Sequence, residues 1–199
     1  MPRCAWVNDD PLYIEYHDTE WGVPEASDRA LFEKIILEGF QAGLSWITIL
    51  RKRENFRAAF DQFNPEIMAR YTARKHNALM KDAGIIRNAK KIEAAVDNAK
   101  AFLEMQERGR GLAHFFWDAV DGEPRQNRFK KLSDIPSETE LSKRLSKELK
   151  KLGFRFVGPT TVYAHMQAMG LVNDHVLGCP RCEDCAKIGS TFKAPLFKT

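Results

Sequence analysis

Residues 27–43, SDRALFEKIILEGFQAG, carry the clearest helical pattern in this sequence. Either of the first two residues, Ser27 or Asp28, can cap a helix, and Gly39 and Gly43 bracket its end. Between them, apolar side chains recur at the spacing of a single helix face. These apolar residues are Leu31, Phe32, Ile35 and Ile36. The stretch therefore predicts one amphipathic helix whose apolar face is buried.

Further helices are predicted outward from this one, whereas the strict alternation typical of strands is hard to find. The expected helices cover residues 45–64, about 88–108, 141–152 and 159–170. Capping signals support two of them: a capping box at residues 137–140, and Pro159 at a first helical position. Residues 121–134 are expected to form an exposed loop. The sequence therefore predicts an all-α fold.

The composition is that of an ordinary soluble globular protein. The chain has 199 residues, 44% of them hydrophobic and 29% charged, with 31 Lys and Arg against 27 Asp and Glu. These values exclude disorder of the whole chain and allow a sizeable core. No apolar run reaches the roughly 18 residues of a membrane-spanning helix, and no apolar signal core follows the first residues. We expect a cytoplasmic protein without a membrane partner, and its net charge of +4 permits a polyanionic one.

Four cysteines are too few for a disulfide scaffold, and their uneven placement suggests a metal site. Cys4 and His17 lie near one end of the chain, and His175 and Cys179 lie near the other. Two thiolates and two imidazoles are a common structural zinc set, provided that the fold brings both ends together. The C-x2-C spacings within residues 179–185 offer a competing zinc or iron–sulfur half-site. A third interpretation gives Cys4 and His17 no role at a metal.

Glu38 lies on the apolar face of the first helix, seven residues after Leu31 and three after Ile35. A buried carboxylate is costly unless a partner compensates it. One interpretation is a misjudged helix phase or a structural ion pair. The other is a polar group at the bottom of a ligand pocket.

Aromatic residues near Glu38 in the sequence favour the pocket. Five of the Trp and Tyr residues fall within the first 46 positions: Trp6, Tyr13, Tyr16, Trp21 and Trp46. Aromatic walls around one carboxylate suit a planar heterocycle, because the rings stack and the carboxylate accepts hydrogen bonds from an exocyclic amine. Each aromatic residue can instead pack in the core, as we expect for Trp21 and Trp117.

Residues 82–92, DAGIIRNAKKI, are typical of a helix, a tight turn at Gly84 and a second helix. Backbone amides at the start of that second helix attract phosphate, and Arg87, Lys90 and Lys91 lie beside it. A nucleic-acid contact is one interpretation of this segment. An ordinary helix turn with solvated basic residues is the other.

Several longer motifs follow one another along the chain: RCAW (3–6), DPLY (10–13), YHDTEWGVP (16–24), LEGFQAGLSW (37–46), DAGIIR (82–87), FRFVG (154–158) and GLVNDH (170–175). In this combination, from about residue 2 to residue 179, the chain resembles the DNA-3-methyladenine glycosylase I family of the helix-hairpin-helix glycosylases. The resemblance implies two interleaved helical lobes with a base pocket between them. It implies one such unit over residues 1–185. The stretch after Cys185 has no periodicity and little apolar content, so we expect a flexible tail over residues 186–199.

The resemblance also implies an activity and a cofactor. Cys4, His17, His175 and Cys179 would hold a structural zinc ion. A monomer would excise 3-methyladenine from double-stranded alkylated DNA by hydrolysing the N-glycosidic bond, which leaves an abasic site. Because methylation at N3 makes the base a cationic leaving group, strong general-acid catalysis is not needed. No lysine nucleophile is needed either, so lyase activity is not expected.

Residue roles follow from the same resemblance. Glu38 would accept hydrogen bonds from the flipped base, with Tyr16 as its polar neighbour. Three aromatic residues would line the pocket and stack on the base: Trp46, Tyr13 and Trp6. Gly43 and Leu44 would fill the gap left in the duplex. The expected phosphate contacts are Gly84, Arg87, Lys90 and Lys91.

The sequence departs from the superfamily pattern at two points. Ile86 occupies the place of the hairpin's second glycine, where a β-branched residue cannot easily adopt a left-handed conformation. A catalytic aspartate after the hairpin has no clear match, and Asp121 and Asp134 are candidates only by loop position. Two other functions stay open: a zinc-stabilised DNA-binding module without catalysis, and a metalloenzyme whose metal acts as a Lewis acid.

Overall fold

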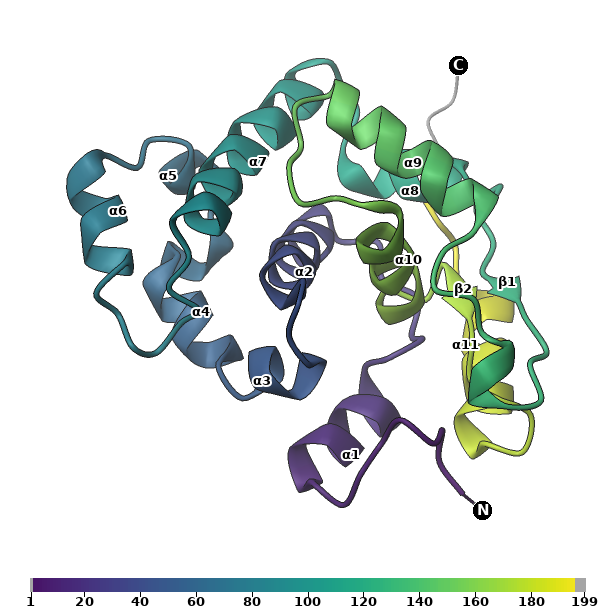
Figure 1. Cartoon of the computed structure of the whole chain (residues 1–199). Coiled ribbons are helices and arrows are strands. Elements are labelled where there is room, and N and C mark those ends of the chain that lie inside the picture. Colours follow the sequence, from purple (N-terminus) through teal and green to yellow (C-terminus); the bar gives the residue numbers. More distant parts are fainter. Residues whose placement is uncertain (1, 196–199) are drawn as a thin grey trace.

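Figure 1 shows the computed structural model of the chain, which describes residues 2–195 and is built mainly of helices. The α-helices are α1 (Pro11–Thr19), α2 (Asp28–Gln41), α3 (Trp46–Leu50), α4 (Arg53–Ala59), α5 (Pro65–Met68), α6 (Ala73–Leu79), α7 (Ala89–Glu107), α8 (Leu112–Asp118), α9 (Glu140–Lys151), α10 (Pro159–Ala168) and α11 (Pro180–Thr191). Two 3-10 turns, η1 (Asp61–Phe63) and η2 (Leu132–Asp134), and two short parallel strands, β1 (Arg125–Gln126) and β2 (Val172–Asn173), complete the regular structure. The prediction of an all-α fold is confirmed. Among the described residues, no helix combines the length and apolarity needed to cross a membrane.

Helix α2 lies in the middle of the molecule and follows the prediction for residues 27–43 (Figure 1). Ser27 is its N-cap, and the Ser27 hydroxyl accepts the amide of Ala30. The four predicted apolar side chains are at most 2% exposed: Leu31, Phe32, Ile35 and Ile36. Helices α3–α7 lie on one side of α2, and α8–α10 lie on the other. Both groups therefore bury their apolar faces against the same central helix.

The helix predicted over residues 45–64 is divided into α3, α4 and the turn η1. Of the four residues expected to face inward, Ile49, Leu50 and Phe56 are buried, whereas Trp46 is only partly buried. The backbone then leaves the right-handed helical region, because Gln62 and its two neighbours have φ values of 51–58°. The apolar periodicity survives these breaks because both short helices face one core, so the periodicity alone could not reveal them.

The capping box of α9 lies two residues later than predicted. Thr139 is the N-cap, its hydroxyl accepts the Ser142 amide at 3.1 Å, and the Ser142 hydroxyl accepts the Thr139 amide at 2.9 Å. Ser142 is fully buried, so its short hydroxyl completes the box where a longer acidic side chain was expected. Leu145 and Leu149 lie on the buried side of α9.

The tail predicted from residue 186 begins later than expected. Helix α11 continues to Thr191, and the Phe192 ring then packs against Trp117 with 4.6 Å between ring centroids. Cys182, Cys185 and Gly189 form the buried side of α11. Small and sulfur-containing residues make that side, so the usual leucine-rich signal of an amphipathic helix is missing. The last part of the predicted tail, residues 196–199, lies outside the described residues.

Candidate active site and metal-binding cluster

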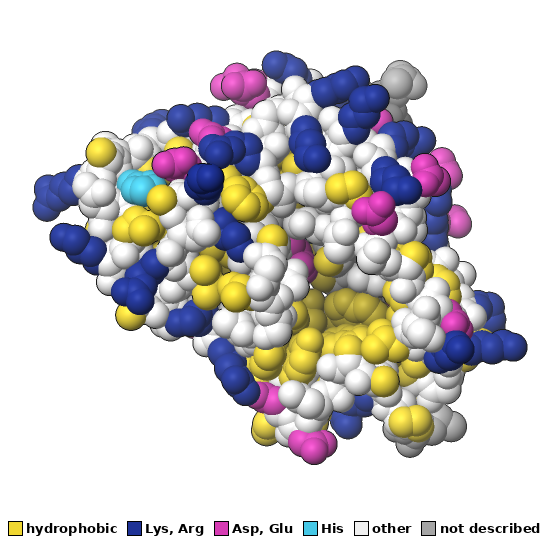
Figure 2. Space-filling view, viewed as in Figure 1, with side chains coloured by type: hydrophobic (Ala, Val, Ile, Leu, Met, Phe, Trp, Pro, Cys, Tyr) yellow, Lys and Arg dark blue, Asp and Glu magenta, His cyan; other side chains and the backbone are white. Residues whose placement is uncertain are grey.

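A cavity of about 440 Å³ opens between α1, α2, α3 and α10. Figure 2 shows it as a hollow in the face of the molecule, with hydrophobic side chains on its floor. The N-terminal quarter of the chain contributes Trp6, Tyr13, Tyr16, Trp21, Glu38, Gln41 and Trp46 to its lining. The opposite wall comes from Leu132, Ile135, Pro136, Ser137, Thr160, Tyr163, Ala164 and Gln167. Its size and largely apolar lining are typical of a small-molecule site.

Glu38 is the buried acidic residue of this cavity. Its side chain is only 4% exposed, and no side chain or amide among the described residues donates a hydrogen bond to it or forms an ion pair within 4.0 Å. Burial raises the pKa of Glu38 to about 7, and the Lys34 ammonium one turn earlier opposes that rise. The interpretation as a misjudged helix phase is therefore wrong. The carboxylate is an acceptor that a ligand in the cavity can use.

Aromatic rings form the walls around that acceptor. The Tyr16 and Trp46 rings lie 5.5 Å apart, and Trp6 lies 5.0 Å from Tyr13, measured between centroids. Tyr16 is almost fully buried, and its hydroxyl accepts a hydrogen bond from Lys34 Nζ at 3.2 Å. The structure thus brings the four aromatic residues predicted for base binding into one cavity with Glu38.

The two tryptophans expected in the core have different places. Trp117 is fully buried, and its indole N–H donates to the Glu25 carbonyl at 2.9 Å. Trp21 lines the cavity and also packs edge-on against His175, with 4.6 Å between centroids. Trp21 therefore separates the cavity from a second cluster of functional side chains.

That second cluster joins the two ends of the described chain. The ligand atoms of Cys4, His17, His175 and Cys179 all lie within 4.8 Å of one another, and all four residues are buried. Three sulfur–nitrogen distances within the cluster are 3.6, 3.6 and 3.7 Å. A tetrahedral zinc ion with ordinary bond lengths requires a sulfur–nitrogen separation of about 3.6 Å. The cluster therefore has the donors and the spacing to hold a metal ion.

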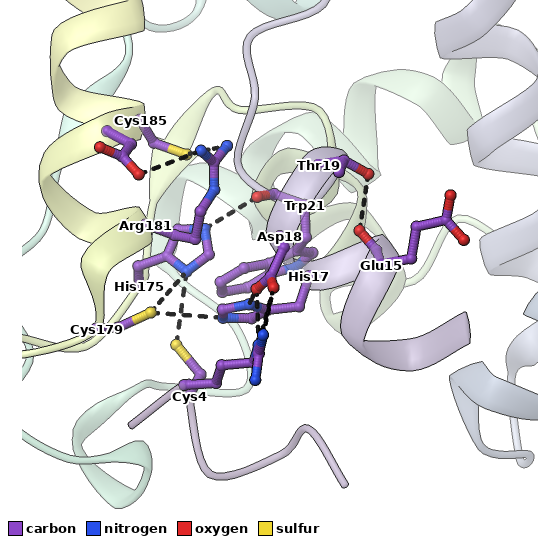
Figure 3. A network of polar contacts seen from close by, with 12 residues as sticks. Cys4, Glu15, His17, Asp18, Thr19, Trp21, His175, Cys179, Arg181 and Cys185 are labelled. Atoms are coloured by element: carbon purple, nitrogen blue, oxygen red, sulfur yellow. Dashed lines mark hydrogen bonds and ion pairs between the residues drawn. The ribbon is translucent and has the colours of Figure 1, made fainter. Parts of the chain in front are cut away.

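Hydrogen bonds orient both imidazoles toward the cluster (Figure 3). The far nitrogen of His175, Nε2, donates to the Trp21 carbonyl at 2.9 Å, and Nδ1 of His17 donates to Asp18 at 2.7 Å. Arg3 holds Asp18 in turn, at 2.7 Å. These bonds leave the other nitrogen of each ring free to bind a metal. Burial lowers the pKa of His175 to about 4, so this ring is neutral, as a ligand must be.

The competing half-site of residues 179–185 is not assembled. Cys182 and Cys185 are buried on α11, but neither belongs to the four-residue cluster of the described chain. Cys185 Sγ instead accepts from Arg181 Nη2 at 3.5 Å. The structure therefore favours the ligand set that spans both ends of the chain.

The turn between α2 and α3 projects beside the cavity. Gly43 has a φ of 83°, and Leu44 is 40% exposed, which is unusual for a leucine. Gln41 braces this turn, because its side-chain amide donates to the Leu44 carbonyl at 3.0 Å and also lines the cavity. The turn is thus a fixed apolar projection at the edge of the site.

The segment around Gly84 is a turn between α6 and α7. Helix α7 begins at Ala89, close to the predicted start, and the Gly84 amide donates to Asp82 at 2.7 Å. A side chain at Gly84 would collide with Asp82 and Asn55, so the glycine is needed for close packing. Arg87 and Lys90 are exposed, and Ile86 lies outside the left-handed region. The β-branched Ile86 is therefore compatible with this turn.

Lys91, predicted as a phosphate contact, is buried and bonded inside the protein. Its side chain is only 8% exposed, and Nζ donates to the carbonyls of Phe40 and Ala42, each at 2.7 Å. These carbonyls end α2, where a cation also interacts favourably with the helix dipole. Lys91 therefore fixes the end of the central helix.

The two loop aspartates do not approach the site. Asp121 and Asp134 are both exposed, and neither lines the cavity of the described chain. Asp134 accepts the amide of Lys131 at 3.3 Å and completes a local cap. The loop itself contributes Leu132 and Ile135 to the cavity, which an exposed loop was not expected to do.

Comparison with known proteins identifies the family. A family model described as methyladenine glycosylase matches residues 6–182, which include the lining of the cavity and three of the four cluster residues, His17, His175 and Cys179. This chain belongs to the methyladenine glycosylase family. DNA-3-methyladenine glycosylase 1 of Escherichia coli (strain K12) is 54% identical over 179 residues, which cover 90% of this chain and 96% of the relative.

Solved structures agree with this assignment of the methyladenine glycosylase fold. A crystal structure of 3-methyladenine DNA glycosylase I has a TM-score of 0.89 and 53% identity, covering 90% of this chain and 98% of that one. A structure on 3-methyladenine recognition by the enzyme from Staphylococcus aureus has a TM-score of 0.86 and 39% identity, covering 89% and 94% of the two chains.

The sequence analysis of this methyladenine glycosylase did not single out the turn between α9 and α10, which lies beside the cavity. Gly153 and Phe156 have φ values of 96° and 54° there, and Asn98 holds the backbone of Arg155 at 2.7 Å and 3.1 Å. Helix α10 begins without a side-chain cap, and Thr160 in its first turn lines the cavity. Three basic residues without an ion-pair partner among the described residues lie beside it: Lys147, Lys150 and Lys151. The spacing of Gly153 and Gly158 was the signal in the sequence that could have indicated this turn.

Proposed function

We propose that this chain excises 3-methyladenine from double-stranded alkylated DNA and leaves an abasic site. The observation that carries this proposal is Glu38, a buried acceptor that receives no hydrogen bond from residues 2–195, in an aromatic cavity of a methyladenine glycosylase family member. The named relatives are DNA-3-methyladenine glycosylases, which supports the same activity.

The proposed reaction breaks the bond between C1′ of the sugar and N9 of the base. The electron pair of that bond goes to the cationic base, which leaves as neutral 3-methyladenine, while a water oxygen bonds to C1′ and releases a proton. Glu38 accepts hydrogen bonds from the adenine edge, and the Tyr16 and Trp46 rings hold the flipped base by stacking. The chain thereby binds the base where its positive charge is stabilised.

We propose that the cavity face contacts DNA at three places. Gly43 and Leu44 fill the space of the flipped nucleotide, because they project beside the cavity mouth. Arg87 and Lys90 contact phosphate near the start of α7. The start of α10, which has no side-chain cap, contacts phosphate near the cavity, and Lys147, Lys150 and Lys151 lie beside it.

We propose a structural zinc ion on Cys4, His17, His175 and Cys179. Four protein ligands complete a tetrahedral shell and leave no position for substrate, which argues against the metalloenzyme alternative. The bound ion would fix the irregular segment before α1 against the end of β2. Because thiolate ligands must stay reduced, we also propose a cytoplasmic location. One chain contains the whole cavity, which supports action as a monomer.

Release of free base tests this function. Purified protein is incubated with methylated duplex DNA, and the released bases are separated by chromatography. The wild-type chain should release 3-methyladenine, and Glu38→Gln should lower the single-turnover rate by at least tenfold. Glu33→Gln is the matched control, since Glu33 lies on the same helix and pairs with Arg57 away from the cavity. DNA binding without base release by the wild-type chain would instead support the non-catalytic module.

A further inference from the structure

Lys34 is a buried lysine that touches the cavity walls from behind. It lies on α2 one turn before Glu38, and its side chain is 8% exposed. Its Nζ atom lies 3.2 Å from the Tyr16 hydroxyl, 4.7 Å from the centroid of the Tyr16 ring and 4.5 Å from that of Trp46. One hydrogen bond and two aromatic faces therefore hold this ammonium in place. Lys34 contacts both rings that would hold the base.

The charges around Lys34 single out Glu38, which lies one helical turn away on α2 and beyond ion-pair distance, as the acidic group that the Lys34 charge influences. Groups from four elements act on Lys34 or on Glu38: Glu33 on α2, Tyr13 and Tyr16 on α1, Glu20 at the end of α1, Arg53 on α4, and His165 on α10. Glu20 pairs with Arg53 at 2.5 Å, and Glu33 pairs with Arg57 at 2.7 Å. Burial lowers the pKa of His165, which is therefore neutral. Glu38 is the acidic group of this set without another cation beside it.

We propose that Lys34 is a positioning residue of the site, which holds the Tyr16 hydroxyl and keeps the Glu38 carboxylate ionised as an acceptor for the base. This inference rests on the proposed function of Glu38. An ionised carboxylate offers acceptors at both oxygens, whereas a protonated one presents a donor to the amino group of the base. A negative Glu38 also attracts a cationic base, and the Lys34–Glu38 pair keeps the empty cavity close to neutral.

The pH dependence of base binding follows from this pairing. Burial raises the pKa of Glu38, and the positive charge of Lys34 lowers it. Removing the Lys34 charge therefore raises the pKa of Glu38 further, so that more of the carboxylate is protonated near neutral pH. Affinity for the base should then fall at neutral pH and return at alkaline pH, where Glu38 is ionised with or without Lys34.

The test measures binding of free 3-methyladenine by calorimetry, and single-turnover excision, between pH 5.5 and about 9. In Lys34→Met, the acidic limb of both profiles, where affinity and excision rate rise with pH, should move to higher pH by about one unit. At a pH below the limb, both quantities should therefore be roughly tenfold lower than in the wild type. Lys34→Arg keeps the charge, so its limb should stay near that of the wild type. At the alkaline end, Lys34→Met should approach the wild-type values within a few-fold.

Lys91→Met is the matched control, because Lys91 is equally buried but binds the end of α2. It should lower stability without moving the limb. The inference is overturned if Lys34→Met, folded by circular dichroism, keeps the wild-type limb or loses activity by the same factor at every pH. Failure of the proposed function would look different: the wild-type chain would release no base, or Glu38→Gln would leave the profile unchanged.

Discussion

Glu38 and Lys34 illustrate how burial changes the chemistry of single residues. Glu38 would be an ordinary carboxylate on the surface, but inside the cavity its pKa is raised to about 7. Burial also lowers the pKa of Lys34, to about 8. Both groups can therefore change protonation state close to neutral pH. A site of this kind adjusts its acceptor through a neighbouring charge rather than through a hydrogen bond from the protein.

His165 shows the same effect without a role in the cavity. It lies on α10, is fully buried, and packs against Phe116 with 4.5 Å between ring centroids. Neither ring nitrogen has a hydrogen-bond partner among the described residues. Burial lowers the pKa of His165 from 6.5 to about 3, so the native state holds this ring neutral.

This burial predicts a loss of stability in acid. Below pH 6.5 the unfolded chain binds a proton at His165 that the native chain does not bind, so the free energy of unfolding falls as pH falls. This group contributes about 1.4 kcal/mol per pH unit. His165→Leu should unfold in urea at pH 8 with similar or higher stability, because two unpaired polar atoms are removed. Between pH 6 and pH 4 it should lose less stability than the wild type; an identical loss would contradict this account.

Elements with a strong apolar period could be predicted from the sequence, and elements defined by tertiary contacts could not. Helices α2, α7, α9 and α10 follow the predicted ranges because each presents one apolar face to the core. Helices α5 and α6 are short, and α1 has aromatic and polar residues on both sides. Helix α1 is held in place by the contacts that its residues make in the cavity lining and in the metal-binding cluster. These contacts produce no apolar period in the sequence.

Phosphate contacts were the least predictable part of the candidate site. The sequence predicts a phosphate contact for Lys91 because it lies in a basic run after a glycine turn. Its ammonium instead donates hydrogen bonds to the carbonyls at the end of α2, inside the protein. A lysine in such a run can reach a helix end far along the chain, which only the folded structure shows. Helix α9 carries three exposed lysines, Lys147, Lys150 and Lys151, that the sequence analysis did not single out.

At the scale of the whole molecule, the metal-binding cluster joins segments that are more than 150 residues apart. Such a long closure constrains the unfolded chain strongly. The Cys and His residues could be predicted as a metal set from spacing and resemblance, although their spacing alone also allowed residues 179–185. Only the fold decides between these sets, because it brings His17 on α1 beside Cys179.

Metal removal should therefore affect stability before chemistry. Cys4→Ser should abolish stoichiometric zinc binding and lower the melting temperature by about 10 °C, which corresponds to a few kcal/mol for a chain of this size. Cys182→Ser is the control, because Cys182 is buried nearby but outside the cluster. Metal content by atomic emission and melting by calorimetry check both variants. An unchanged melting temperature in zinc-free Cys4→Ser would show that the cluster does not stabilise the fold.

Across the whole molecule, the cavity, the cluster and the projecting turn lie around the residue on which the proposed function depends, because we propose that Glu38 is the acceptor that recognises the excised base. The most direct measurement is a crystal structure with free 3-methyladenine bound. We expect the base in the cavity, in contact with the aromatic walls that include Tyr16 and Trp46, with its amino nitrogen within about 3 Å of a Glu38 carboxylate oxygen. A base bound elsewhere, or bound in this cavity with Glu38 turned away from it, would contradict the account.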